Sequence, residues 1–163
     1  MLFHLSIDAD DPQRVATVLA ELWGGQATPF PPVAQGSWLA HAGDDRNTMV
    51  EVYPRGTELV ATDEGAIGVP GTQRRANPVH FAMATAMDKQ AVLAIARREG
   101  WPAEHHMRGG GAFGVIEIWV EGCQMVEVLT PEMQREYLDT ITLENWRKLI
   151  ESDAFAEEIA RAA

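Results

Sequence analysis

Cysteine is nearly absent from the sequence, in which Cys123 is the only one among 163 residues. A single thiol can form neither an intramolecular disulfide nor a CxxC motif for metal or redox chemistry. The chain must therefore be stabilised by its core, and with 46% hydrophobic and 23% charged residues it can bury one. We expect a globular protein of a reducing compartment.

Basic residues are also scarce. The sequence has 13 Lys and Arg residues against 24 Asp and Glu residues, and its formal net charge is −11. Nucleic acids and anionic membrane surfaces attract proteins through basic patches. The acidic balance therefore disfavours both as partners.

Long hydrophobic runs are missing as well. No apolar stretch approaches the roughly 18 residues that a membrane span requires. Residues 1–8 alternate between apolar and polar side chains, unlike the basic and apolar regions of a signal peptide. We expect a cytoplasmic protein.

What the sequence does contain is a long internal repeat. Residues 3–7, Phe-His-Leu-Ser-Ile, resemble residues 79–83, Val-His-Phe-Ala-Met, and the tetrapeptide Met-Val-Glu-Val occurs at both 49–52 and 125–128. Both pairs are separated by 76 residues, a period longer than those of solenoid repeats. The pattern predicts one duplicated module.

Each copy is predicted to fold as a strand, a helix and three further strands, which makes the protein α+β. In the first copy, Asp11-Pro12 and Gly24 bound a stretch with apolar residues at helical spacing, and in the second copy Asp88 and Gly100 do so. The strands are expected near residues 1–8, 28–33, 37–42, 48–53, 79–85, 103–107, 113–120 and 124–129, from their alternating patterns and turn residues.

The chain is thus divided into four parts. The modules cover residues 1–54 and 78–130, a polar linker covers 55–77, and a helical extension covers 131–163. The extension carries an apolar stripe that includes Trp146 and Phe155. Because an exposed apolar stripe promotes association, we expect it to be covered by the body or by another subunit, and we predict a homodimer with these helices at its interface.

Four polar side chains occupy matched positions in the two copies. Strand alternation places His4 and Glu51, and likewise His80 and Glu127, opposite their apolar neighbours, with 47 residues between His and Glu in each copy. A carboxylate in the middle of a strand is costly unless it is paired or bound to a cation. Two imidazoles and two carboxylates leave one or two positions of a divalent ion open, as in a catalytic site. We predict that these four residues bind one metal ion.

A plainer explanation remains open, in which the histidines are hydrogen-bonded strand residues and the glutamates pair with arginines. His41 and Glu117 are equivalent in the repeat, but the ambiguous hairpin register does not tell which face they occupy. His105 and His106 are expected in a loop or an edge strand. Residues 109–111, three glycines, are expected in a flexible turn, since they lack the strand-to-helix context of a phosphate-binding loop.

The repeated motifs at 3–7, 49–52, 79–83 and 125–128 resemble the vicinal oxygen chelate superfamily of glyoxalases, bleomycin-resistance proteins and extradiol dioxygenases. The resemblance covers roughly residues 1–131 and implies two βαβββ modules that form a curved, mainly antiparallel eight-stranded sheet around a metal. The His/Glu/His/Glu set is that of glyoxalase I. Extradiol dioxygenases and fosfomycin-resistance enzymes use two His and one Glu, and methylmalonyl-CoA epimerase-like enzymes often have Gln at the position of Glu51.

The resemblance to glyoxalase I implies a metal-dependent lyase or isomerase that removes a proton next to a metal-chelated carbonyl or enediolate oxygen of a small-molecule substrate. Glu127 would be the base, Glu51 a ligand and a candidate second proton carrier, and His4 and His80 fixed ligands. The cofactor would be one divalent ion per site, of nickel, zinc, manganese, cobalt or iron. Relatives pair their modules within a chain or across a dimer, and the linker is long enough for both.

The sequence departs from glyoxalase I where that family contacts glutathione. Asp8 stands in place of the usual Arg, Arg55 in place of the usual Asn, and Glu121-Gly122 in place of an Asp-Pro-Asp-Gly turn. An Asp would repel the carboxylates of glutathione, so we expect a substrate that is not glutathione-linked. Two alternatives are a metal-free small-molecule binding protein of the bleomycin-resistance type and, against the extra carboxylate, an extradiol-type dioxygenase.

Overall fold

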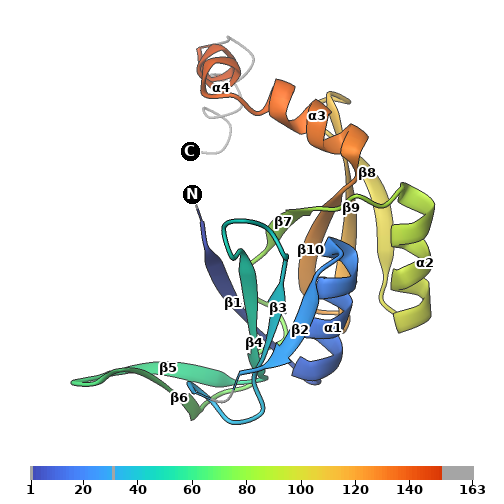
Figure 1. Ribbon diagram of the computed structural model, residues 1–163. Helices are drawn as coiled ribbons and strands as arrows, with labels where there is room; N and C mark the ends of the chain where they lie inside the picture. The colour runs from blue at the N-terminus through green and yellow to red at the C-terminus, as the bar shows by residue number, and fades with distance from the viewer. Residues whose placement is uncertain (1, 31, 152–163) are drawn as a thin grey trace.

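The first of two βαβββ modules is built around α1 (Figure 1). The computed structural model describes residues 2–30 and 32–151. The first module contains β1 (His4–Ala9), α1 (Pro12–Trp23), β2 (Gln26–Pro29), β3 (Trp38–His41) and β4 (Met49–Pro54). Its sheet has the order β1-β4-β3-β2, with β1 parallel to β4 and the other pairs antiparallel. The second strand is shorter and begins earlier than the predicted range 28–33.

The second module repeats this topology. It contains β7 (Phe81–Ala84), α2 (Lys89–Glu99), β8 (Ala103–Arg108), β9 (Phe113–Val120) and β10 (Gln124–Leu129). Its sheet has the order β7-β10-β9-β8, with β7 parallel to β10. The predicted α+β class and the mainly antiparallel pairing are confirmed, and the eight strands are arranged as two four-stranded sheets.

The helices begin and end where the sequence indicates. The side chain of Asp11 accepts a hydrogen bond from the backbone of the first turn of α1, and that of Asp88 does the same for α2. Gly24 and Gly100 end the two helices with φ of 76° and 73°, a left-handed conformation that glycine adopts without a Cβ clash.

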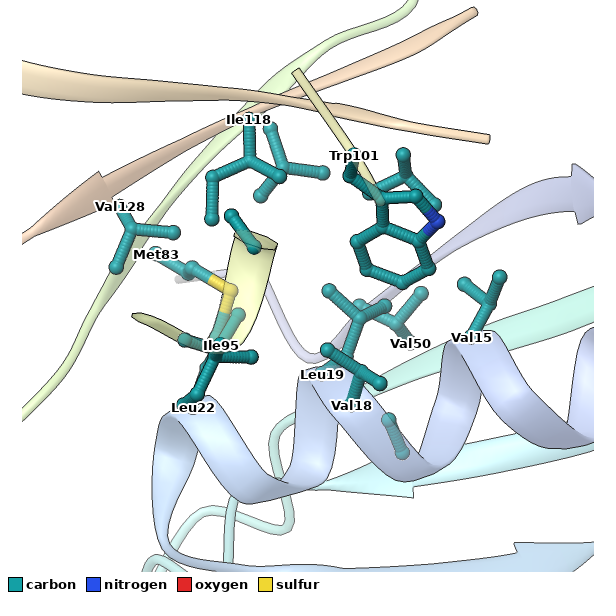
Figure 2. Close-up of a cluster of buried hydrophobic side chains, with 14 of the residues drawn as sticks. Val15, Val18, Leu19, Leu22, Val50, Met83, Ile95, Trp101, Ile118 and Val128 are labelled. Carbon is teal, nitrogen blue, oxygen red and sulfur yellow. The ribbon is translucent and has the colours of Figure 1, made fainter. Parts of the chain in front are cut away.

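One hydrophobic core joins the two modules. Val50 and Val52 of β4 and Val126 and Val128 of β10 are all fully buried in it. Figure 2 shows side chains of α1 packed with residues of the second module: Val15, Val18, Leu19 and Leu22 with Met83, Ile95, Trp101, Ile118 and Val128. Because side chains alternate along a strand, the opposite faces of the two sheets are turned away from this shared core.

Ion pairs between α1 and α2 hold the modules in place at the surface. Arg14 Nε lies 2.7 Å from Glu99 Oε2, and Arg98 donates to Glu21 Oε1 over 2.9 Å. The pKa of Glu21 is lowered, first by its hydrogen bond from Arg98. These contacts, together with the shared core, fix how the two modules of one chain are packed.

The linker is more ordered than the sequence suggested. Residues 55–77 were expected to form a polar connection, but they contain a β-hairpin of β5 (Thr57–Thr62) and β6 (Gly65–Pro70). Leu59, Val60 and Ile67 of the hairpin are exposed, and the hairpin projects away from both modules in Figure 1. Its strands were overlooked because neither face is buried, so the alternating pattern is weak.

The extension begins with two helices, α3 (Pro131–Thr140) and α4 (Leu143–Ile150). Met133 of α3 is buried in the core, whereas Leu138 and Leu143 are 70% and 65% exposed. Phe155, part of the predicted apolar stripe, lies outside the described residues. Within residues 2–30 and 32–151, no helix has the length and apolar character needed to cross a membrane.

Candidate metal centre

His4 and Glu51 come together on the outer face of the first sheet. Because β1 and β4 are parallel with Ser6 opposite Glu51, the side chains of His4 and Ser6 share a face with this carboxylate. His4 Nε2 lies 3.9 Å from Glu51 Oε1. Two donors that each bind one ion at about 2.1 Å are roughly 3–4 Å apart, so this pair fits two ligands of a divalent cation.

The other oxygen of Glu51 is held by two hydroxyl groups. Glu51 Oε2 accepts hydrogen bonds from Ser6 Oγ at 2.9 Å and from the Tyr53 hydroxyl at 2.6 Å. Burial, and then the bond to Glu51, raise the pKa of Tyr53 to about 12, so the hydroxyl keeps its proton and remains a donor. The alternation of side chains along β1 and β4 places Ser6 and Tyr53 on the same face as Glu51. This pattern is visible in the sequence, but the two hydroxyls were not predicted as partners of the carboxylate.

Glu127 occupies the equivalent position in the second sheet, but His80 precedes the first strand of that sheet and is not within ion-pair distance of Glu127. Glu127 lies between Ala82 of β7 and Glu117 of β9. His80 comes one residue before β7, is exposed, and its Nδ1 lies 3.3 Å from the carbonyl oxygen of Pro78. Across the part of the chain that the structure describes, the Glu127 carboxylate has no hydrogen-bond or ion-pair partner, and neither it nor Glu51 contacts an arginine.

The two halves of the predicted site do not meet within one chain. Among residues 2–30 and 32–151, no group of three or more His, Cys, Asp or Glu side chains is arranged to hold a metal ion. The shared core explains this, because the faces that carry Glu51 and Glu127 are both turned away from it. Each module carries one of the predicted imidazoles and one of the predicted carboxylates, and in the first module the two lie 3.9 Å apart.

The structure also places the residues that the sequence left open. His41 lies on the Glu51 face, where its Nε2 is 3.0 Å from Thr28 Oγ1. Glu117 lies directly opposite Glu127 but is paired with Arg108, and His106 Nε2 is 3.7 Å from its other oxygen.

His105 and His106 lie in the edge strand β8, as expected, and residues 109–111 form the turn that follows it. His105 lines a cleft of about 770 Å³ between α2, β8 and α3. This cleft contains none of the four predicted ligands, so it is separate from the candidate centre.

Asp8 and Arg55, two of the three expected departures from the glyoxalase I pattern, pair with each other. The Arg55 guanidinium contacts Asp8 at 2.9 Å, Asp10 at 2.6 Å and Glu121 at 2.6 Å. The backbone amides of Asp10 and Asp11 also donate to the Glu121 carboxylate. Burial favours a neutral Arg55, but the carboxylates around it outweigh burial and raise its pKa. Through Glu121 this cluster joins the first module and the linker to the second module.

A cleft of about 530 Å³ opens beside the Glu51 pair. Ser6 and Tyr53 line it, together with Asp8, Val79 of the segment before β7, and Arg74 of the linker. Within the described residues Arg74 has no hydrogen-bond or ion-pair partner, whereas neighbouring Arg75 is bound to Asp10. The cleft can thus admit a small molecule next to the carboxylate that the hydroxyls hold.

Solved structures with this fold are distant in sequence. A lactoylglutathione lyase from Agrobacterium tumefaciens is 14% identical over 78% of this chain and 91% of its own, with a TM-score of 0.53. The fosfomycin resistance protein FosX from Mesorhizobium loti is 13% identical over 83% and 95%, with a TM-score of 0.50. The hypothetical protein SA1046 from S. aureus is 9% identical over 80% and 96%, with a TM-score of 0.50.

No family model matches the sequence, and no curated protein matches it. The structural likeness shows the fold alone: this chain is folded like the lactoylglutathione lyase and FosX, in agreement with the two-module fold that its repeated motifs predicted.

Proposed function

We propose that this protein is a metal-dependent lyase or isomerase that removes a proton next to a carbonyl group of a small molecule not linked to glutathione. The proposal is supported most by the His4–Glu51 pair, whose separation suits a shared divalent ion, and by the recurrence of His and Glu at the same sequence spacing at His80 and Glu127. The pairing of Asp8 with Arg55 supports the exclusion of glutathione, since both positions are occupied by an internal contact.

We place the complete site between two chains. Each chain presents its two half-sites on faces turned away from the shared core, so a half-site can be completed only by the complementary half of a second copy. A symmetric dimer would contain two equivalent sites. The exposed apolar side chains Leu138, Leu143 and Ile150 of the extension would contribute to the interface.

We assign metal binding and proton transfer to different residues. His4 and His80 would hold the ion as neutral imidazoles, and Glu51 would hold it through Oε1. The ion supplies Lewis acidity, which stabilises negative charge that develops on the substrate oxygen. The Glu127 carboxylate, which has no partner in the described chain, is the group able to accept the substrate proton.

Mixing two defective chains tests the arrangement. One chain carries His4→Ala and Glu51→Gln, and the other carries His80→Ala and Glu127→Gln. Neither homodimer should bind cobalt(II), but the mixed dimer should bind one ion, because one of its two sites combines the intact halves of both chains. Wild-type protein should bind one ion per chain.

Three results would count against the proposal. A mixed dimer that binds no ion, beside a wild type that does, would place each site within one chain. If the wild-type protein binds less than a tenth of an equivalent of cobalt, zinc, nickel or manganese, the proposed metal dependence is wrong. That result would favour a metal-free binding protein. Oxygen uptake with catechols after ferrous loading would favour the dioxygenase.

A further inference from the structure

The two glutamates of the duplicated motif differ in what surrounds them. Glu51 Oε2 accepts two hydrogen bonds, from Ser6 and Tyr53, while Oε1 faces His4. Tyr53 is 5% exposed, and its hydroxyl donates to this carboxylate over 2.6 Å. Two donors on one oxygen fix both the position and the rotation of the carboxylate.

The duplicate lacks both donors. Ala82 is opposite Glu127 in the parallel pair β7–β10, as Ser6 is opposite Glu51 in β1–β4. Leu129 follows Glu127 by two residues, as Tyr53 follows Glu51. The backbone frame is thus the same in the two modules, but both hydroxyl groups are missing from the second.

We propose that Ser6 and Tyr53 are positioning residues that fix Glu51 as a metal ligand, and that their replacement by Ala82 and Leu129 leaves Glu127 free to move. This rests on the proposed function. A ligand carboxylate oriented by neighbouring donors binds an ion more tightly, because less conformational freedom is lost on binding. A carboxylate that accepts and then releases a proton must instead change its partners during the reaction. The duplication has therefore produced one fixed and one mobile carboxylate.

Metal titration of the full-length chain tests the proposal without any substrate. Ser6→Ala and Tyr53→Phe should each weaken cobalt(II) affinity by about tenfold to hundredfold, as expected when a group that orients a ligand is removed. Ser6→Thr, which retains a hydroxyl, should bind nearly as wild type. Ser37→Ala removes a buried hydroxyl that donates to the carbonyl of Ala34, away from the site, and serves as the matched control.

The reciprocal change adds a donor where the duplicate lacks one. Ala82→Ser places a hydroxyl opposite Glu127, on an exposed position that tolerates it. It should restrain the Glu127 carboxylate and leave cobalt affinity close to that of the wild type, because Glu127 is the proposed proton acceptor and not one of the proposed ligands. A several-fold change in cobalt affinity would make Glu127 a ligand and contradict its mobile role.

The outcomes separate the two proposals. If wild-type protein binds no cobalt, the proposed function fails. If wild type binds and both Ser6→Ala and Tyr53→Phe bind equally well, the metal site stands and the positioning role is wrong. Ser6 is only partly buried, so Ser6→Ala gives an answer even if Tyr53→Phe fails to fold.

Discussion

The Arg55 side chain is 3% exposed and is surrounded by the carboxylates of Asp8, Asp10 and Glu121. Glu121 has a positive φ of 51°, which is unfavourable for a residue with a Cβ. Its ion pair and the two backbone amides that it accepts compensate for this conformation. The sequence analysis singled out Asp8, Arg55 and Glu121 but not Asp10. Glu121 is 66 positions from Arg55, and nothing in a single sequence shows that distant charges meet.

Replacing Arg55 should destabilise the whole fold. Arg55→Met leaves Asp8 and Glu121 without a cation and Asp10 with the exposed Arg75 alone. Removing one partner of a buried ion pair typically costs about 3–5 kcal/mol. Urea denaturation measures this loss. Arg46→Met, which removes an exposed arginine 3.8 Å from Asp45, should change stability by less than about 1 kcal/mol. A loss for Arg55→Met no larger than that of the control would contradict the structural role.

Asp10 makes stability depend on acid pH. Burial alone would raise its pKa, but hydrogen bonds from Arg55 and Arg75 outweigh burial and lower the pKa below its ordinary value of 3.8. The carboxylate therefore stabilises the folded state above pH 3.8, and this contribution is lost as the pH falls through the lower folded-state pKa. Asp10→Asn should be less stable at neutral pH and should lose less stability on acidification. If the mutant and the wild type lose the same stability on acidification, Asp10 does not cause this pH dependence.

At the level of helices and strands, most of the correct predictions came from the internal repeat. Asp11 and Asp88 correctly marked helix starts, and the duplicated motifs correctly marked four strands, because caps and buried alternation are local signals. The hairpin of β5 and β6 was missed because it buries neither face. The separation of the two half-sites could not be predicted either, since it depends on how α1 and α2 share one core.

The cap of α2 provides a test at this level. The Asp88 side chain accepts the backbone amide of Ala91 over 2.8 Å. Asp88→Ala leaves that amide without its partner and should cost about 1 kcal/mol, measured by thermal or urea unfolding. Asp88→Asn, which can still accept the bond, should lose less. Equal losses for the two substitutions would assign the effect to charge instead of capping.

For the whole molecule, α3 and α4 have different roles. Met133 of α3 is buried in the core, and Gln134 donates to the carbonyl oxygens of Thr85 and Leu129. A chain ending at Thr130 should therefore unfold more easily, whereas a chain ending at Ile141 should keep its fold and form a weaker dimer. Light scattering at tens of micromolar, together with thermal unfolding, measures both. If the full-length protein is a monomer, the predicted dimer is wrong. If the chain ending at Ile141 dimerises as strongly as the full-length chain, α4 does not contribute to the interface.

The pairing of Asp8 with Arg55 also limits how this sequence can have changed over time. Restoring the Arg of the glyoxalase I pattern at position 8 alone would set two guanidinium groups against each other in a nearly closed space. Restoring Asn at position 55 alone would leave Asp8, Asp10 and Glu121 to repel one another. Each single step passes through a less stable protein, so the two positions are epistatic.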